Sequence, residues 1–117
     1  DYLIFLDDDD VLVDGILSVV REIVAATPGA LFLFRARFYG YGAIPDGTVL
    51  WRDCEIRDGN VSTAQIVCPN KPGLPKWAAH GVLRYNTDFT FIRDVAGLTQ
   101  TIWQDEILQI TRPIQWS

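Results

Sequence analysis

The chain has 117 residues, of which 49% are hydrophobic and 21% charged, a balance typical of one folded domain spanning residues 1–117. Its formal net charge of −5 argues against nucleic-acid binding, because that function needs a basic surface to displace counterions from phosphates. No apolar run is long enough to span a bilayer, and two cysteines, Cys54 and Cys68, are too few for a disulfide framework. We therefore expect a cytoplasmic protein with reduced thiols.

The first third of the chain predicts a strand, a helix and a second strand. The apolar run at residues 2–6 is typical of a buried parallel strand. Helical spacing of apolar residues follows, with Asp14 as the expected N-cap and Pro28-Gly29 as the expected end. Residues 31–38 then return to strand character. This order is typical of an α/β fold.

The remainder predicts shorter elements separated by turns. We expect strands at residues 48–52 and 64–68, a turn at residues 58–60, and irregular structure around the prolines that follow. A helix begins near Thr87 in this reading, with four apolar residues on one face: Phe91, Ile92, Val95 and Leu98. A short strand at residues 107–112 ends the pattern, so we expect a mixed α/β domain with a partly antiparallel second half.

Four consecutive aspartates, residues 7–10, follow the first apolar run. In an extended strand Asp7 and Asp9 would point to one side and Asp8 and Asp10 to the other. Two such charges at ~4 Å repel by about 1 kcal/mol in water and about 4 kcal/mol at an effective dielectric near 20. A divalent cation would relieve that repulsion, and hard oxygen ligands suit Mg²⁺ or Mn²⁺. The alternative is a solvated acidic turn.

Two enzyme families end a strand in this way. The spacing of Asp7, Asp9 and Val11 resembles that of haloacid-dehalogenase-like phosphatases, whose nucleophile and acid/base are two residues apart. Those enzymes also need a later Ser or Thr, a Lys and an acidic pair. Both lysines here, Lys71 and Lys76, fall in a proline-rich stretch, and the three further motifs cannot be placed.

The second resemblance covers nearly the whole chain. Four segments are similar to segments of family-2-like GT-A glycosyltransferases and occur in the same order. They are Phe-Leu-Asp-Asp-Asp-Asp at 5–10, Gly-Asn-Val-Ser-Thr at 59–63, Val-Cys-Pro-Asn at 67–70 and Arg-Tyr-Asn-Thr-Asp-Phe at 84–89. The closing stretch at residues 102–113 is also similar. The resemblance implies a partial GT-A-like, Rossmann-related mixed sheet with flanking helices. It also implies metal-dependent, inverting transfer of a sugar from a nucleotide-sugar donor to an acceptor hydroxyl.

The resemblance assigns roles to individual residues. It implies Mn²⁺ or Mg²⁺ ligands among three aspartates: Asp7, Asp9 and Asp10. Asp7 and Asp8 would contact the substrate, and Asp88 matches the general base of such enzymes. The alternative for Asp88 is an ordinary capping residue in the first turn of a helix, where the dipole favours a carboxylate.

Aromatic and basic side chains offer further substrate contacts. Trp51, Trp77 and Trp103 are flat apolar platforms for a sugar ring, although core packing is the commoner role. Trp77 is the best of them, because its loop is rich in proline and glycine. Arg84 is a candidate partner of the diphosphate, and an ordinary ion pair is its alternative.

The resemblance lacks one half of the family domain. A GT-A domain normally begins with a βαβ half that binds the nucleotide, and no such half precedes the aspartate run here. The first strand would then leave an open sheet edge at residues 2–6. A rival hypothesis is therefore a truncated, non-catalytic domain that self-associates through this edge or binds another partner.

Overall fold

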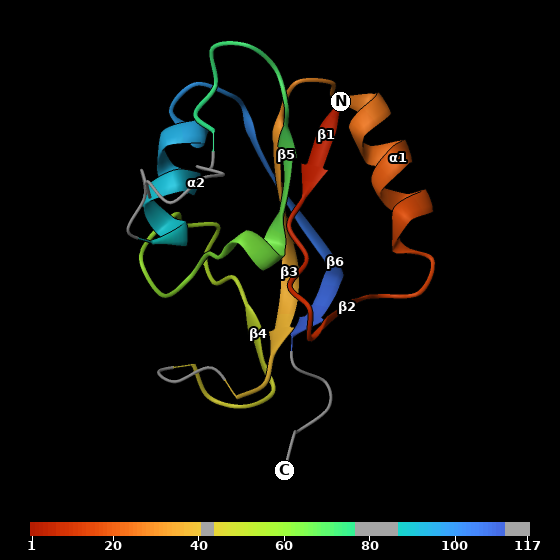
Figure 1. Ribbon diagram of the computed structural model, residues 1–117, viewed down its shortest axis with the longest axis vertical. Coiled ribbons are helices and arrows are strands. Elements are labelled where there is room, and N and C mark those ends of the chain that lie inside the picture. The colour runs from red at the N-terminus through yellow and green to blue at the C-terminus, as the bar shows by residue number, and fades with distance from the viewer. Residues whose placement is uncertain (41–43, 77–86, 112–117) are drawn as a thin grey trace.

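A mixed sheet lies between two helices in the computed structural model, which describes residues 1–40, 44–76 and 87–111 (Figure 1). Its elements are β1 (Tyr2–Ile4), β2 (Asp10–Leu12), α1 (Ile16–Ala26), β3 (Leu31–Phe38), β4 (Thr48–Leu50), the 3₁₀ helix η1 (Thr63–Gln65), β5 (Ile66–Pro69), α2 (Asp88–Ala96) and β6 (Thr101–Thr111). The strand order is β1-β5-β3-β6-β2, with β4 paired to β3. The expected mixed α/β class is confirmed. Neither helix in the described ranges is long and apolar enough to cross a membrane.

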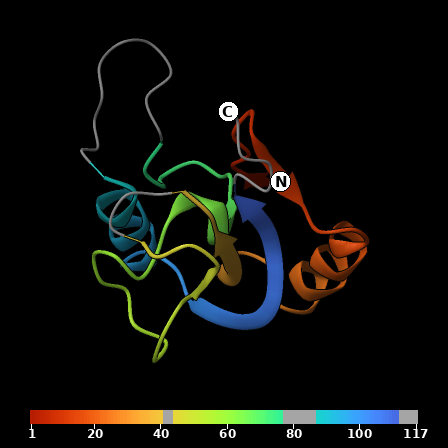
Figure 2. The ribbon, with the colours of Figure 1, turned by 90° about the horizontal axis from the view of Figure 1, so that it is seen from below.

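Strand β3 forms the centre of the domain. Its first four residues are fully buried and alternate between the two faces of the sheet, as an extended backbone requires. Leu31 and Leu33 pack in the cluster that contains α2, whereas Phe32 and Phe34 pack in the cluster that contains α1. Both views place the two helices on opposite faces of the sheet (Figure 1, Figure 2). A continuous apolar run at 31–34 therefore reports burial on both sides.

Strand β6 is longer than the sequence predicts and gives the sheet its curl. It runs parallel to β3 over its whole length, and the register shifts twice beside Arg35. Such irregularities bend a strand, and Figure 2 shows β6 as a curved arc. The expected short strand at 107–112 captured only the second half of β6, because residues 101–106 are half-buried or exposed and lack an apolar run.

The prediction of a buried parallel strand at residues 2–6 is wrong. Strand β1 ends at Ile4, pairs antiparallel with β5, and lies at the edge of the sheet. Tyr2 and Ile4 pack toward α1, while Leu3 and Leu6 remain 40% and 50% exposed. An edge strand has a neighbour on one side only, so apolar composition alone could not show that this run is half solvent-facing.

The helices agree with the sequence except at their ends. The expected helix start near Thr87 is confirmed, since α2 begins at Asp88 with Thr87 as its N-cap, but Leu98 lies beyond the helix and is exposed. Asp14 is not the N-cap of α1: Gly15 takes that position with φ 77°, a left-handed conformation that glycine adopts without strain. The strand expected at residues 64–68 instead begins at Ile66, because η1 occupies the preceding three residues.

Candidate functional site

Three of the predicted site residues meet at one cavity of about 200 Å³, which we call the aspartate cavity. Its described lining consists of Phe5, Asp7, Asp10, Phe38, Ile44, Ser62, Thr63, Ala64 and Asp88. Asp7 and Asp10 come from the N-terminal aspartate run, and Asp88 comes from a segment almost eighty residues later. The charged residues of this lining are all carboxylates, so the cavity favours a cation.

The aspartate run is a turn and not the end of a strand. The backbone N–H of Asp10 donates to the carbonyl of Asp7 at 3.1 Å, with Asp8 and Asp9 at the turn. The predicted alternation of the four side chains is therefore wrong, because Asp8 and Asp9 lie in a turn and not in an extended strand. Reversal at this turn places Asp10 at the start of β2, opposite Thr111 of β6.

The turn separates the four aspartates into two pairs. Asp7 is exposed and Asp10 is 8% exposed, and both line the aspartate cavity. Asp8 is exposed and Asp9 is half-buried, and neither belongs to the lining. Of the three aspartates expected to bind metal, the structure thus brings Asp7 and Asp10 to the cavity.

Asp88 is held by two hydrogen bonds from one residue. Its Oδ2 accepts from the backbone N–H of Thr63 at 3.0 Å and from the Thr63 hydroxyl at 3.1 Å. The cap of α2 is made by Thr87, whose hydroxyl accepts from the N–H of Thr90 at 3.2 Å. Asp88 is therefore not the capping residue of its own helix. Its carboxylate joins the first turn of α2 to η1 at the wall of the aspartate cavity.

Ser62 and Thr63 contribute to the cavity and were missed by the sequence reasoning. Ser62 is the N-cap of η1: its hydroxyl accepts from the N–H of Ala64 at 3.2 Å, and its own N–H donates to Gln65 Oε1 at 2.7 Å. The sequence Ser-Thr-Ala-Gln carries the signature of such a capping box. That signal could have predicted a helical start at Ser62, although it would not have shown that the next residue, Thr63, bonds Asp88.

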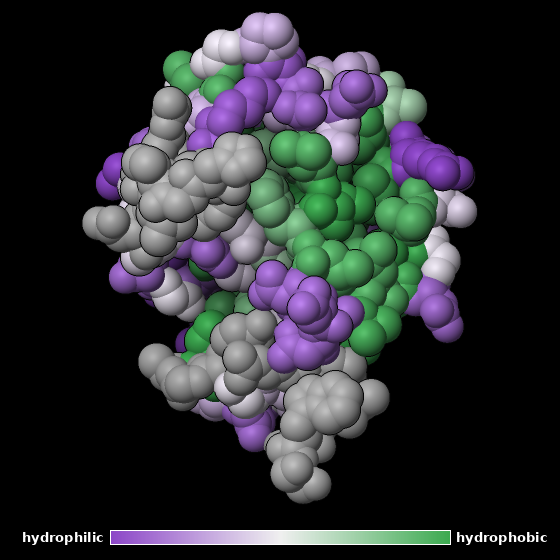
Figure 3. All heavy atoms as spheres, in the orientation of Figure 1, coloured by the Kyte–Doolittle hydropathy of each residue, from purple (hydrophilic) through white to green (hydrophobic). Residues whose placement is uncertain are grey.

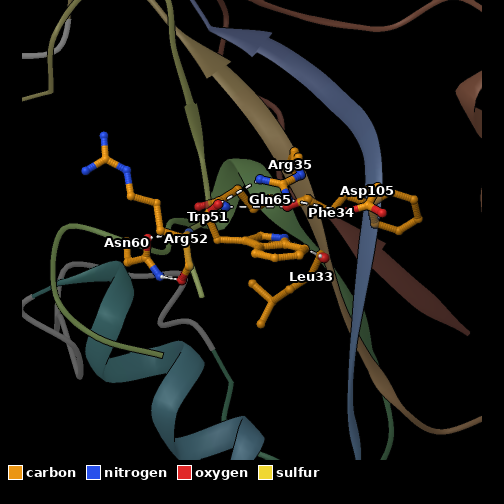
Figure 4. Close-up of polar contacts among 8 residues, drawn as sticks. All are labelled: Leu33, Phe34, Arg35, Trp51, Arg52, Asn60, Gln65 and Asp105. Atoms are coloured by element: carbon orange, nitrogen blue, oxygen red, sulfur yellow. Dashed lines mark hydrogen bonds and ion pairs between the residues drawn. The ribbon is translucent and has the colours of Figure 1, made fainter. Parts of the chain in front are cut away.

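Trp51 belongs to the core and does not offer a platform for a sugar. It is 6% exposed, and its indole N–H donates to the carbonyl of Leu33 at 3.1 Å (Figure 4). The ring of Trp103 packs edge-on against it, with 4.9 Å between the ring centroids. The guanidinium of Arg35 covers the Trp51 ring at 3.9 Å from its centroid. Trp77 and Arg84, the other expected substrate contacts, lie outside the described residues.

Metal binding at the aspartate cavity would need ligands from the substrate. Within residues 1–40, 44–76 and 87–111, no group of three or more His, Cys, Asp or Glu side chains could hold a metal ion. Mg²⁺ commonly takes one or two carboxylates and completes its shell with water and substrate phosphates. Asp7 and Asp10 fit that arrangement.

Both cysteines are free thiols, Cys54 on the surface and Cys68 in the interior. Burial raises the pKa of the Cys68 thiol to about 11, despite the opposing effect of Lys76. Cys68 packs in the cluster beneath α2 and has the environment of a structural thiol.

Comparison of the chain with protein-family models, with curated proteins and with solved structures found no match. Any function is therefore to be argued from the chain's own residues and their geometry.

Proposed function

We propose that the chain carries the metal and general-base side of a metal-dependent glycosyltransferase that uses a nucleotide-sugar donor. The observation that supports this proposal is the meeting of Asp7, Asp10 and Asp88 at one cavity. The sequence resemblance assigns the first two to the metal and the third to the base, and these assignments concern segments far apart in the chain. Packing brings the three residues together independently of the resemblance.

In this proposal Asp7 and Asp10 hold Mn²⁺ or Mg²⁺ together with the donor diphosphate. The bound cation would supply charge stabilisation to the departing diphosphate. The chain itself contributes the turn that brings Asp7 and Asp10 to the lining of one cavity, and the position of Asp10 in β2.

Asp88 accepts the proton of the attacking acceptor hydroxyl. Both hydrogen bonds from Thr63 reach Oδ2, so they set the orientation of the carboxylate from one side. A general base must be held within reach of the proton that it takes, and the bonds from Thr63 hold Asp88 at the wall of the aspartate cavity.

Calorimetry tests the donor side. We expect Mn²⁺-dependent binding of UDP or GDP to the intact chain, with loss of at least about tenfold in affinity in Asp10→Asn and Asp7→Asn, since one lost charged contact is worth about that factor. Asp14→Asn removes the same charge from an exposed residue outside the cavity lining and should bind normally. Equal binding by all three variants would refute the metal assignment.

The base is tested separately. Asp88→Asn keeps an oxygen that can accept from Thr63 but cannot take a proton. We expect it to bind Mn²⁺ and nucleotide normally and to lose at least about 100-fold in the rate of sugar release from a sugar nucleotide, the usual contribution of general-base catalysis. The matched control is Asp94→Asn on the same helix. Unchanged rates in Asp88→Asn would exclude Asp88 as the base.

A second candidate function rests on the surface beside β1. Apolar side chains gather there over β1, β2 and α1 (Figure 3), and the exposed large ones are Leu3, Leu6, Val11 and Leu17. The edge of β1 and this surface together suit pairing with a second copy of the chain. Sedimentation of Leu3→Glu tests it, with Leu98→Glu as the control at the far side of the domain. A dimer that only Leu3→Glu dissociates would support the interaction role.

The geometry gives less support to a phosphatase. That reaction needs Asp7 and Asp9 to face one substrate, and Asp9 lies outside the lining of the aspartate cavity.

A further inference from the structure

A second cavity, of about 160 Å³, adjoins the aspartate cavity, and Ile44 lines both. We call it the arginine cavity, because the charged residues in its described lining are Arg52 and Arg57. Thr48, Gly59 and Asn60 supply further polar lining. Two adjoining cavities of opposite charge thus lie side by side in a chain whose net charge is −5.

The loop that carries both arginines is fixed at its base by Asn60. The Asn60 side chain accepts from the N–H of Arg52 and donates to the carbonyl of Arg52, both at 2.8 Å (Figure 4). It also donates to the carbonyl of Glu55 at 2.7 Å. Two consecutive residues of the loop, Asp53 and Cys54, hold left-handed φ values of 56° and 48°. Such conformations persist where surrounding contacts over-determine the backbone. The loop is therefore a defined support for the two guanidinium groups.

Neither guanidinium is committed to the core of the protein. In Figure 4 the Arg52 side chain extends away from Trp51 and Asn60, and it has no side-chain partner among the residues that the structure describes. Arg57 Nε donates to Glu55 Oε2 at 3.0 Å, and these two side chains are 49% and 62% exposed. An ion pair that exposed is weak and can exchange for another anion. Arg35 differs, because its guanidinium donates to the carbonyl of Trp51 and stacks on the Trp51 ring.

We propose that the arginine cavity binds an oxyanion, a phosphate or a carboxylate, carried by the molecule whose hydroxyl enters the aspartate cavity. The planar fork of arginine matches both groups by paired N–H donors. The carboxylates next door repel the same anion, so the opposite charges of the two cavities orient the bound molecule in one direction. Binding of the anion stands on the cavity alone, whereas its assignment to the acceptor rests on the proposed function.

Titration of the ¹⁵N-labelled chain with sodium phosphate, at constant ionic strength, tests the cavity by nuclear magnetic resonance. A second titration with glucuronate distinguishes a carboxylate from a phosphate. We expect saturable shifts at the Arg57 Nε–H and at the backbone amides of Gly59 and Asn60. Shifts that do not saturate, or that are equally large at the exposed Arg21 on α1, would overturn the proposal.

Variants make the test quantitative. Arg52→Gln and Arg57→Gln should each weaken the preferred anion by about tenfold, the value of one charge-assisted hydrogen bond. Glu55→Gln should strengthen it, because the competing carboxylate is gone. Arg21→Gln and Glu22→Gln make the same charge changes on α1 and should leave the affinity unchanged. Equal effects from the α1 variants would reduce the result to non-specific attraction and refute the site.

The two proposals fail separately. Metal-dependent nucleotide binding should weaken by at least about tenfold in Asp10→Asn, whereas binding of phosphate or glucuronate alone should persist in that variant. Anion binding without nucleotide binding would retain the arginine cavity and refute the donor site. Nucleotide binding without saturable anion binding would retain the donor site and refute the arginine cavity as an anion site.

Discussion

Replacement of Asn60 by alanine should destabilise the domain strongly, because the Asn60 side chain holds the loop between β4 and η1. Asn60 is 1% exposed and its side chain makes three hydrogen bonds of 2.7–2.8 Å, one accepted and two donated. A net value of about 1 kcal/mol for each bond gives a loss of about 3 kcal/mol in the free energy of unfolding. That is a large part of the roughly 5–15 kcal/mol of a typical domain.

Urea unfolding followed by fluorescence measures the change. The matched control is Asn70→Ala, which removes an exposed asparagine whose side chain accepts from Lys76 and should cost less than about 0.5 kcal/mol. Asn60→Asp keeps the acceptor but loses both donors and places a charge beside two carbonyl oxygens. We expect it to be at least as destabilising as Asn60→Ala.

A loss below about 1 kcal/mol in Asn60→Ala would refute the reasoning, because the bonds would then be exchanged for water at no cost. The loop would no longer count as a fixed support for Arg52 and Arg57. If Asn60→Ala loses the predicted ~3 kcal/mol but its folded fraction binds the anion unchanged, Asn60 stabilises the domain without positioning Arg52 and Arg57.

Two further predictions concern the core beneath α2. Stability should fall as the pH rises from 9 toward 11, because the unfolded Cys68 thiol ionises near its ordinary pKa of 9.0 while burial holds the folded pKa at about 11. The slope approaches about 1.4 kcal/mol per pH unit in this window, and the stability curve of Cys68→Ala should lack this contribution. A wild-type curve parallel to that of the variant would contradict the prediction. Trp51→Phe removes the indole hydrogen bond to Leu33 and some packing, and should cost about 2 kcal/mol by urea unfolding. Trp103→Phe, at a half-buried residue, should lose less free energy of unfolding than Trp51→Phe. A larger loss in Trp103→Phe would contradict the central role given to Trp51.

Local sequence signals predicted the central elements well. Residues 31–34 are apolar without a break because β3 is buried on both faces, and the bounds of β3 agree with the prediction. Thr87 followed by an apolar face at 91, 92 and 95 located α2 for the same reason. Burial selects apolar side chains at a fixed period, so a strongly buried element is readable from its own residues.

Edge positions and long-range pairing were not readable in this way. The run at residues 2–6 is as apolar as a central strand, yet β1 has β5 as its single neighbour and is antiparallel to it. The length of β6 depends on its pairing with β3, some seventy residues earlier, and not on its own pattern. The pairing of strands depends on contacts throughout the chain, and local propensity does not predict it.

The acidic candidates of the site were visible in the sequence: four adjacent carboxylates stand out by charge, and the family resemblance marks Asp88. Their selection came from the folded chain, which places Asp7, Asp10 and Asp88 in the lining of one cavity. A turn in place of a strand end turns Asp8 and Asp9 away from the lining and leaves Asp7 and Asp10 in it, and packing of α2 against η1 delivers Asp88 to the same wall. The direction of a side chain depends on the backbone conformation beneath it, and that conformation was fixed by contacts made far along the chain.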